Sequence, residues 1–513
     1  MRNLVVCCDG TWNTPDQKQG GLPCPTNVVK IFNACEESDQ QIKYYHPGVG
    51  TEGSKFKRMV AGSIGIGLDQ NIQSAYNWLC GHYHTGDRIF LFGFSRGTYT
   101  VRSLSGFIQR CGLLKLDDQE NPNKFWKRIE IAYREGYRKR EDKEVWGKEW
   151  TTLMDEEGNP PDIHFIGVWD TVGARGVPDE MVLADILIDD PANYRFHDTS
   201  LSPRVHHAYH AVALDEMRAS FAPTLWTVEK ERPENTTYEQ LWFVGNHCDV
   251  GGGHVECGLS DIALQWMSEK AAKYGLCLNQ KLLKQLRPDS KSVLHDGIDG
   301  IWKLLRTLPR AVPLICQGNV SKALLHDSVL DRYNDPPISQ APYRATTHLL
   351  KEQSWSGDIF ALEHWNYTGV WLEKGMTYQF NAQGEWIDSS NRSGPEGIDD
   401  RKFHLGEMVY RAGDLIARME DWYRDLTGKM ETDWWGTKRY ENGSKWFELI
   451  GMVANQHDVD GSGTPPLGEF FTIGHATAFT PKESGYLYCF ANDAWSFYDN
   501  NRGSVSLKIT RNT

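Results

Sequence analysis

The first half of the chain alternates between short apolar runs and stretches in which apolar residues recur at helical spacing. The apolar runs, which predict β-strands, are NLVVCC (3–8), IKYYHPG (42–48), RIFLFG (88–93), IHFIGVWDT (163–171) and LWFVGNH (241–247). Helical periodicity is clearest in GLDQNIQSAYNWLCGHY (67–83). Strands that alternate with helices are typical of a parallel sheet covered by helices. The pattern therefore predicts an α/β fold with helices on both faces of the sheet.

The second half has a different pattern, in which short alternating runs are separated by Gly, Asn and Asp. Such spacing is typical of a small β-sandwich. One helical pattern, at 406–426, predicts an insert in that sandwich. The expected organisation comprises a first domain over 1–345, with a helical cap or lid-like tail over 275–345, a linker over 346–364 and the β-sandwich over 365–513.

Polar side chains follow the five predicted strands at their carboxyl ends. These residues are Asp9, His46, Ser95, Asp170 and His247. Active sites of open parallel sheets lie just outside the carboxyl ends of the strands. An acid, a base and a nucleophile are all present in this set, so we expect a catalytic site at this edge.

Ser95 lies between two glycines in Gly93–Gly97, directly after a predicted strand and before a predicted helix. A G-x-S-x-G sequence at such a junction is typical of a nucleophile elbow, in which the serine stands on a sharp turn. An ordinary glycine-bounded turn is the alternative. An elbow would provide the Arg96 backbone N–H as one oxyanion donor, and we expect a second donor from Gly10 or Thr11.

A serine nucleophile needs an imidazole to take its proton and a carboxylate to orient that imidazole. We predict His247 as the base and Asp170 as the acid. Asp249 is the rival acid, His326 the rival base, and His210 a weaker one. An adjacent charged set, predicted to be a buried ion-pair support, comprises Asp215, Glu216 and Arg218.

Near the C-terminal end, the loop 492–503 contains many oxygen-bearing side chains, namely Asp493, Asp499, Asn500 and Asn501. A hard cation such as calcium prefers six to eight oxygen ligands. Asn and Asp are also common turn residues, so a polar hairpin explains the composition equally well. The residues alone leave both interpretations open.

Composition narrows the class of protein. The 513 residues carry a net charge of −13 without a basic stripe, which argues against a nucleic-acid partner. The 11 cysteines show no C-x-x-C spacing, as expected for reduced thiols in a protein made in the cytoplasm. The first residues do not resemble a signal peptide, and no run approaches the roughly 18 apolar residues of a membrane span.

Several motifs in the first domain occur together and in order: CCDGTWN, GFSRGTYTVRSLSGFI, FIGVWDTVGA, HAVALDEMRASFAP and WFVGNHCDVGGGH. Together they resemble the α/β-hydrolase family that includes the phospholipase effectors of type VI secretion systems. The resemblance implies a Ser–Asp–His triad at Ser95, Asp170 and His247, and export by a contact-dependent secretion system. Cys248 and His254 replace the serine and tyrosine common in that family, which leaves the substrate open.

The stretch from GVWLEKGMTYQFNAQGEW to GYLYCFANDAWSFYDNNRGSVSLKI resembles the calcium-dependent galactose-binding bacterial lectin domain over about 365–511. The resemblance implies calcium held by the side chains of Asp493, Asn500 and Asn501 and by the carbonyl of Phe497. It implies a further carbonyl from 387–389. A galactose-like glycan is the expected partner of this domain.

These observations lead to a serine esterase or lipase, with phospholipid as the expected substrate and transient contact with a membrane surface. The alternatives are an esterase for an acylated polysaccharide or polyester, and an inactive hydrolase fold that serves as a carbohydrate-binding protein. A lipase needs an apolar cover over Ser95, and 296–318 is either that cover or a core helix.

Overall fold

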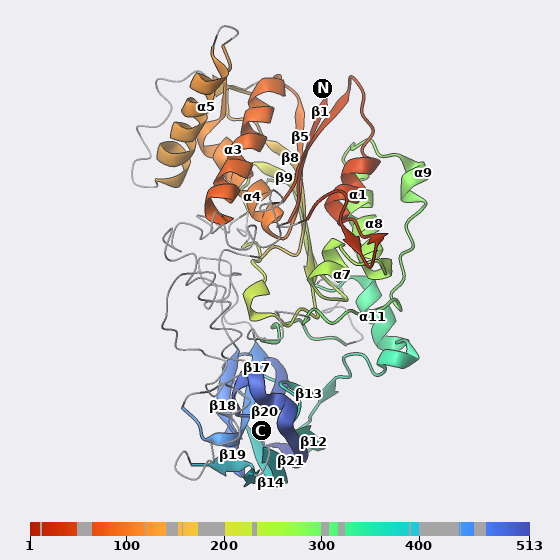
Figure 1. Ribbon diagram of the computed structural model, residues 1–513, viewed down its shortest axis with the longest axis vertical. Helices are drawn as coiled ribbons and strands as arrows, with labels where there is room; N and C mark the ends of the chain where they lie inside the picture. The colour runs from red at the N-terminus through yellow and green to blue at the C-terminus, as the bar shows by residue number, and fades with distance from the viewer. Residues whose placement is uncertain are drawn as a thin grey trace.

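The computed structural model describes residues 1–10, 13–48, 64–117, 120–139, 152–155, 157–172, 201–227, 233–298, 307–316, 324–388, 391–399, 441, 443–455 and 468–512. Two bodies of different architecture make up this part of the chain (Figure 1). We call residues 1–345 the α/β part and residues 346–512 the β-rich part. The predicted helical insert at 406–426 lies outside the described residues.

The α/β part is built on a sheet with the strand order β10-β9-β8-β5-β1-β4. Its strands are β1 (Asn3–Cys8), β4 (Gln41–His46), β5 (Arg88–Phe94), β8 (Ile163–Trp169), β9 (Val205–Ala213) and β10 (Thr237–Phe243). Every neighbouring pair in this order is parallel. The predicted parallel sheet is confirmed, although β9 was not among the predicted strands.

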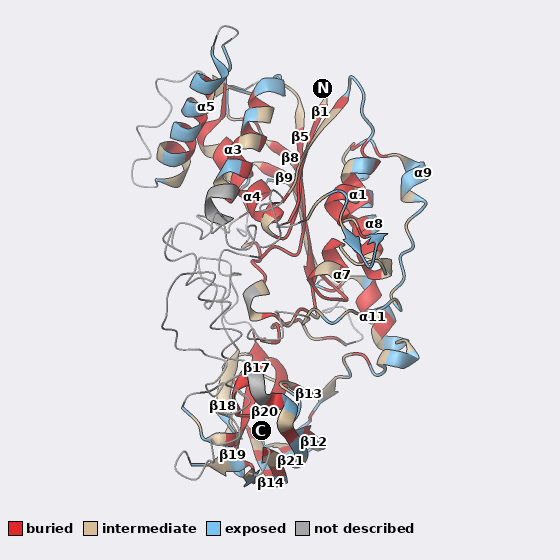
Figure 2. Cartoon of the chain, viewed as in Figure 1, coloured by how far each residue is buried: buried red, intermediate tan, exposed pale blue. Residues whose placement is uncertain are grey.

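Helices cover both faces of the sheet, as predicted (Figure 1). One face carries α3 (Ile64–His82), α4 (Arg96–Cys111) and α5 (Pro122–Ile131), and the other carries α1 (Asn27–Ala34), α7 (His247–Gly251) and α8 (Gly258–Lys273). Alternate residues of β1 enter opposite cores, since Leu4 and Val6 pack on one side and Val5 and Cys7 on the other. This two-residue period is the reason that β1 is apolar and buried on both faces, whereas the edge strands β4 and β10 are only partly buried (Figure 2).

The β-rich part consists of two sheets. One contains β11 (Thr347–His348), β13 (Asn366–Leu372), β20 (Gly485–Ala491), β17 (Trp446–Asn455) and β16 (Glu396–Ile398), with β18 (Glu469–Thr472) paired to β17. The other contains β12 (Ser354–Phe360), β21 (Asn501–Arg511), β14 (Tyr378–Asp388) and β15 (Asn391–Ser393), with β19 (Ala476–Phe479) paired to β14. Side chains of both sheets, such as Leu449 and Leu507, share one apolar core.

The boundary between the parts differs from the expectation. The segment 346–364, expected to be a linker, contributes β11 and β12 to the two sheets. The run SWSGDIF (354–360) alternates between more exposed and less exposed positions, as a strand does. Most of its residues are exposed or only partly buried, so the pattern of apolar residues is weak.

The segment 307–316 lies between the two parts and is not helical at any of its ten positions. The alternative of a core helix over 296–318 is therefore wrong for these residues, and 299–306 and 317–323 lie outside the described residues. In the rest of the expected cap, short helices form at α9 (Gln280–Leu283) and α11 (Asp327–Asn334). None of the described helices is both long enough and apolar enough to span a bilayer.

Candidate active site

Ser95 occupies a sharp turn between β5 and α4, as the glycine spacing predicted. Its backbone has φ 56° and ψ −124°, a conformation that a residue with a side chain rarely adopts. A Cβ on Gly97 would lie 2.1 Å from the carbonyl oxygen of Cys8, and one on Gly93 would lie 2.7 Å from the carbonyl oxygen of Gly97. Only glycine at both positions lets the turn pack this tightly against β1.

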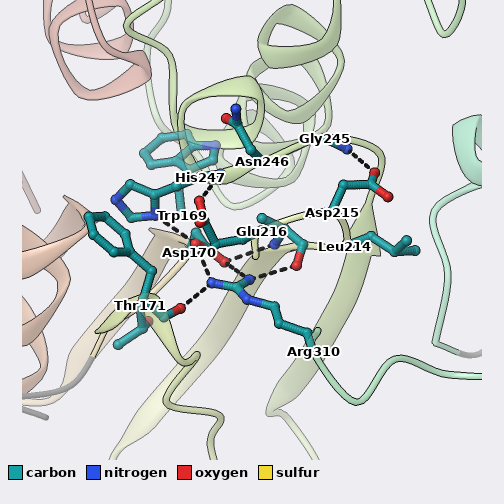
Figure 3. A network of polar contacts seen from close by, with 12 residues as sticks. Trp169, Asp170, Thr171, Leu214, Asp215, Glu216, Gly245, Asn246, His247 and Arg310 are labelled. Atoms are coloured by element: carbon teal, nitrogen blue, oxygen red, sulfur yellow. Dashed lines mark hydrogen bonds and ion pairs between the residues drawn. The ribbon is translucent and has the colours of Figure 1, made fainter. Parts of the chain in front are cut away.

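Asp170 lies beside Ser95 because their strands are neighbours. Phe94 at the end of β5 pairs with Trp169 at the end of β8, and the Ser95 N–H donates to the Trp169 carbonyl at 3.2 Å. The next residue, Asp170, has a φ of 34° and is fully buried. Its Oδ2 receives a hydrogen bond of 2.6 Å from Nδ1 of His247 (Figure 3).

His247 opens the short helix α7 beyond β10. Its ring lies 4.5 Å from the ring of Phe94 and 4.9 Å from that of Phe221, centroid to centroid, which places it next to the elbow. Among the described residues, no hydrogen bond joins the Ser95 hydroxyl to this imidazole, so direct contact between nucleophile and base stays a prediction. With Nδ1 bound to Asp170, Nε2 is the nitrogen left for proton transfer.

Burial favours a neutral imidazole at His247, and the neighbouring groups favour an ionised carboxylate at Asp170. Burial lowers the pKa of His247, although Asp170 opposes the shift. Burial alone would raise the pKa of Asp170, but the Arg310 guanidinium and His247 outweigh it and hold that pKa well below its usual range. A neutral histidine next to a carboxylate is the protonation state required of a general base.

Sequence reasoning missed Arg310, which holds the Asp170 carboxylate from the side opposite His247. Nη1 donates to Oδ1 at 2.7 Å and Nη2 to Oδ2 at 3.0 Å, a two-pronged contact (Figure 3). Nη1 also donates to the Ala213 carbonyl at 2.6 Å. A lone arginine far along the chain, in TLPRAVP, carries no local signal that it will reach a strand end.

A family model described as "T6SS, Phospholipase effector Tle1-like, catalytic domain" matches residues 2–270, just over half of the chain. The chain belongs to this Tle1-like family.

Individual relatives are less informative than the family model. The chain is 32% identical over 249 residues to "Uncharacterized protein YEL023C" of Saccharomyces cerevisiae, a match that covers 44% of this chain and 33% of the relative. The chain thus spans about a third of the length of that curated relative.

Two solved structures show limited likeness. An uncharacterised protein from Pseudomonas aeruginosa has a TM-score of 0.33 and 18% identity, covering 56% of this chain and 49% of its own. A chain described as "EclA N-terminal domain; PllA-like lectin" has a TM-score of 0.19 and 17% identity, covering 31% and 95% respectively. TM-scores this low do not establish a shared fold.

Within the Tle1-like domain, the rival acid Asp249 has a different partner. Its Oδ1 accepts from Nδ1 of His295 at 2.6 Å, and its Oδ2 accepts the N–H of Asn246 at 3.1 Å, which closes a capping box on α7. Asp249 therefore orients the helix that carries His247 and does not contact the His247 ring. The hydrogen-bonded acid of His247 is Asp170.

The rival histidines also have other positions. His326 caps α11, with Nδ1 2.9 Å from the Ser328 hydroxyl, and stacks on Phe243. His210 lies inside β9, fully buried, between Thr171 and Gln240. Burial lowers the pKa of His210 to about 3.

The predicted ion-pair support is present in part. Glu216 accepts two hydrogen bonds from the Arg218 guanidinium and a third, at 3.1 Å, from the backbone N–H of His247. Asp215, expected in the same set, pairs instead with Arg344 at 2.7 Å. The Glu216–Arg218 pair thus supports the start of α7 directly below the imidazole.

At Gly10, one of the two predicted second oxyanion donors, the backbone N–H already has an acceptor. Its N–H donates to Asp9 Oδ1 at 2.7 Å, so this hydrogen bond competes with any oxyanion. Asp9 is itself buried, holds the Thr26 and Tyr45 hydroxyls, and has a pKa that burial raises to about 6. Thr11 lies outside the described residues, and Arg96 is the first residue of α4.

Three of the predicted calcium ligands, Asp493, Asn500 and Asn501, lie near one another and near the end of β14. Asp493 and Asn501 are buried, and Asn501 Nδ2 donates to Asp493 Oδ2 at 3.0 Å. Asn500 Nδ2 donates to Asp388, the last residue of β14, at 2.6 Å. Asp388 was missed, since the sequence comparison suggested only backbone carbonyls from 387–389.

The buried oxygens of this cluster are the ones that could hold a cation. The side-chain oxygens of Asn500 and Asn501 are buried and accept no hydrogen bond from any described residue. Burial, and then the charge of Asp388, raise the pKa of Asp493 to about 7. Asp499 is exposed, and Phe497 belongs to the turn Trp495–Asn500. Two orphaned amide oxygens beside two buried carboxylates form a donor set that suits calcium.

Proposed function

We propose that this protein is a serine carboxylic ester hydrolase whose substrate is a phospholipid. Ser95 is the nucleophile, His247 the general base and Asp170 the residue that orients the base. The observation that carries the proposal is the 2.6 Å hydrogen bond from His247 to Asp170, next to a serine held at φ 56° by two obligatory glycines.

The proposed reaction has two halves. The Ser95 hydroxyl attacks the ester carbonyl while Nε2 of His247 takes its proton, and the alcohol leaves with that proton, so an acyl-enzyme remains. Water, deprotonated by the same nitrogen, then releases the fatty acid and restores Ser95. The Arg96 N–H at the start of α4 is the proposed donor to the developing oxyanion. Arg310 and His247 keep Asp170 ionised throughout.

The phospholipid substrate is supported by membership of the Tle1-like family, whose description names phospholipase effectors of type VI secretion. We propose delivery by such a contact-dependent system and transient contact with the membrane surface of the target. An ester on a polysaccharide or polyester remains the alternative substrate, because the triad chemistry is the same for both.

The experiment is a panel of phospholipids and acyl esters of graded chain length, assayed with wild type and Ser95→Ala. Loss of the nucleophile should lower kcat by at least about a thousandfold on every accepted substrate. Ser105→Ala, which changes another buried serine of α4, is the matched control and should retain activity. If Ser95→Ala retained more than about a tenth of the wild-type rate, the nucleophile assignment would be wrong.

A second proposal concerns the β-rich part, which we propose binds calcium and, through it, a galactose-like glycan. The side chains of Asp388, Asp493, Asn500 and Asn501 would hold the ion, and the carbonyl of Phe497 is a further proposed ligand. The orphaned amide oxygens support this proposal, because a cation would satisfy them. Bound calcium would offer coordination sites to vicinal sugar hydroxyls.

A further inference from the structure

Arg310, which hydrogen-bonds to the Asp170 carboxylate, lies outside the residues that match the family model. That match ends at residue 270, whereas Arg310 lies in the extended segment 307–316, which we call the strap. Arg310 is buried and makes hydrogen bonds to both oxygens of Asp170. The site described above is therefore incomplete without the strap.

Contacts on both sides hold the strap. On the α/β side, the Leu308 N–H donates to the Met217 carbonyl at 2.6 Å. On the β-rich side, the Trp365 indole N–H donates to the Thr307 hydroxyl at 3.0 Å, and the Ile315 N–H donates to the Tyr486 hydroxyl at 2.9 Å. The two contacts from the β-rich part thus bracket Arg310 in the sequence.

We propose that Arg310 is a positioning residue for the catalytic acid and that the β-rich part, through Trp365 and Tyr486, holds it in place. The proposal rests on the function proposed above for Asp170. It makes the β-rich part a component of the active site as well as a binding module.

The geometry explains why arginine is needed. A planar guanidinium contacts both carboxylate oxygens at once and fixes the rotation of the carboxylate, which a lysine cannot do. Its charge also offsets part of the Asp170 charge that His247 experiences. Among the described residues, the other charged groups that act on His247 are Glu216 and Arg218, which form an ion pair with each other.

Two variants of Arg310 separate its shape from its charge. Arg310→Lys keeps the charge and loses the two-pronged contact, so kcat should fall by about a hundredfold while the His247 pKa stays near its wild-type value. Arg310→Met loses both, so kcat should fall similarly and the His247 pKa should rise by roughly one unit, because the full Asp170 charge then stabilises the imidazolium. A purely structural role would not produce this difference.

The His247 pKa is measured in two ways. The acid limb of the kcat/KM profile reports it during turnover, and 15N NMR of histidine-labelled full-length protein reports it without substrate. If wild type hydrolysed no ester in the panel, the proposed function would fail while the NMR titration still tested Arg310. Equal His247 pKa values in wild type and Arg310→Met, with both folded by thermal melting, would overturn the proposal.

The contribution of the β-rich part is tested with the double variant Trp365→Phe/Tyr486→Phe, which removes both hydrogen bonds to the strap. We expect kcat to fall about tenfold, and no further fall when the same pair is introduced into Arg310→Met. Tyr378→Phe is the control, because it removes a buried hydroxyl that also accepts a backbone N–H in the β-rich part, away from the strap. Independent, additive losses would show that the β-rich part does not act through Arg310.

Discussion

Two residues of the site, Ser95 and Asp170, have positive φ angles although neither is glycine. Such conformations cost of order 1–3 kcal/mol each and persist where the surroundings impose them. Here the surroundings are the paired ends of β5 and β8, which place the two strained residues side by side. From this position the Asp170 carboxylate reaches the His247 ring that α7 presents.

The protonation state of this single residue, His247, predicts how the rate depends on pH. Since burial lowers its pKa below the ordinary 6.5, the imidazole should stay neutral, and active as a base, in mildly acidic solution. We expect kcat/KM to rise with pH through a midpoint below 6.5 and to level off by neutrality. The measurement is a pH–rate profile on a soluble ester.

The variant Asp170→Asn tests the direction in which Asp170 shifts the His247 pKa. The carboxylate raises the His247 pKa, so its removal should move the midpoint to lower pH, in addition to lowering kcat. A midpoint that moved upward in this variant would contradict the assignment of Asp170 as the partner of His247.

At the scale of elements, the loop between β20 and β21 and the end of β14 bring four oxygen-bearing side chains together. We predict that calcium stabilises the full-length protein, because binding to the native state adds RT ln(1 + [L]/Kd), about 2.7 kcal/mol at a hundredfold excess over Kd. Differential scanning calorimetry with calcium and then with a chelator measures the effect.

The variant Asp493→Asn should abolish the calcium response while keeping the side-chain shape. Asp358→Asn, which changes an exposed carboxylate of β12, is the matched control and should respond as wild type does. A melting temperature that calcium leaves unchanged in wild type would rule out the metal site and, with it, the support for glycan binding.

The elements that sequence patterns predicted are those with strong local signals. Apolar runs identified β1, β5 and β8, and the glycine spacing around Ser95 identified the elbow. The run VHHAYHAVA (205–213) was missed as β9 because its three histidines interrupt the apolar pattern, although His207 and His210 are buried there. The end of β10 was placed too late, since the strand stops at Phe243 and a turn precedes His247.

Residues that act across long stretches of sequence carried no such signal. Arg310 and Asp388 each reach their site through the tertiary fold, and a single charged residue in an unpatterned segment has many alternative explanations. The chain order Ser, Asp, His suggested which groups belong together, but only the packed sheet separates Asp170 from Asp249 as the partner of His247.

At the scale of the whole molecule, the two parts share an apolar contact and a hydrogen bond of an arginine. Trp242 and Leu325 of the α/β part pack in one cluster with Tyr486 and Tyr488 of the β-rich part. Beside this cluster, Arg344 pairs with Asp215 of the same α/β part at 2.7 Å and donates to the Tyr488 hydroxyl of the β-rich part at 3.0 Å. Because these contacts join the two parts, we expect the parts to unfold together.

We predict that Arg344→Met weakens this coupling. The change leaves the Asp215 carboxylate without its cation, so the free energy of unfolding should fall by about 3 kcal/mol, and the calorimetric transition should broaden or split. Arg392→Met, which breaks an exposed pair with Glu385, should change stability by less than about 1 kcal/mol. An unaltered single transition in Arg344→Met would show that the parts are coupled in another way.

The pairing of β12 with β21 has a consequence for how the protein is made. Among the described strands, β12 pairs in a sheet with β21 alone, and the facing hydroxyls of Ser354 and Thr510 are 156 residues apart in sequence. At roughly 5–20 residues per second, a ribosome needs on the order of ten seconds or more to supply the partner strand. During that interval β12 emerges with an unpaired edge, which is open to pairing with other nascent chains. Production of the intact protein should therefore require that the last part of the chain is translated quickly. Otherwise, a chaperone would have to shield this strand until β21 is available.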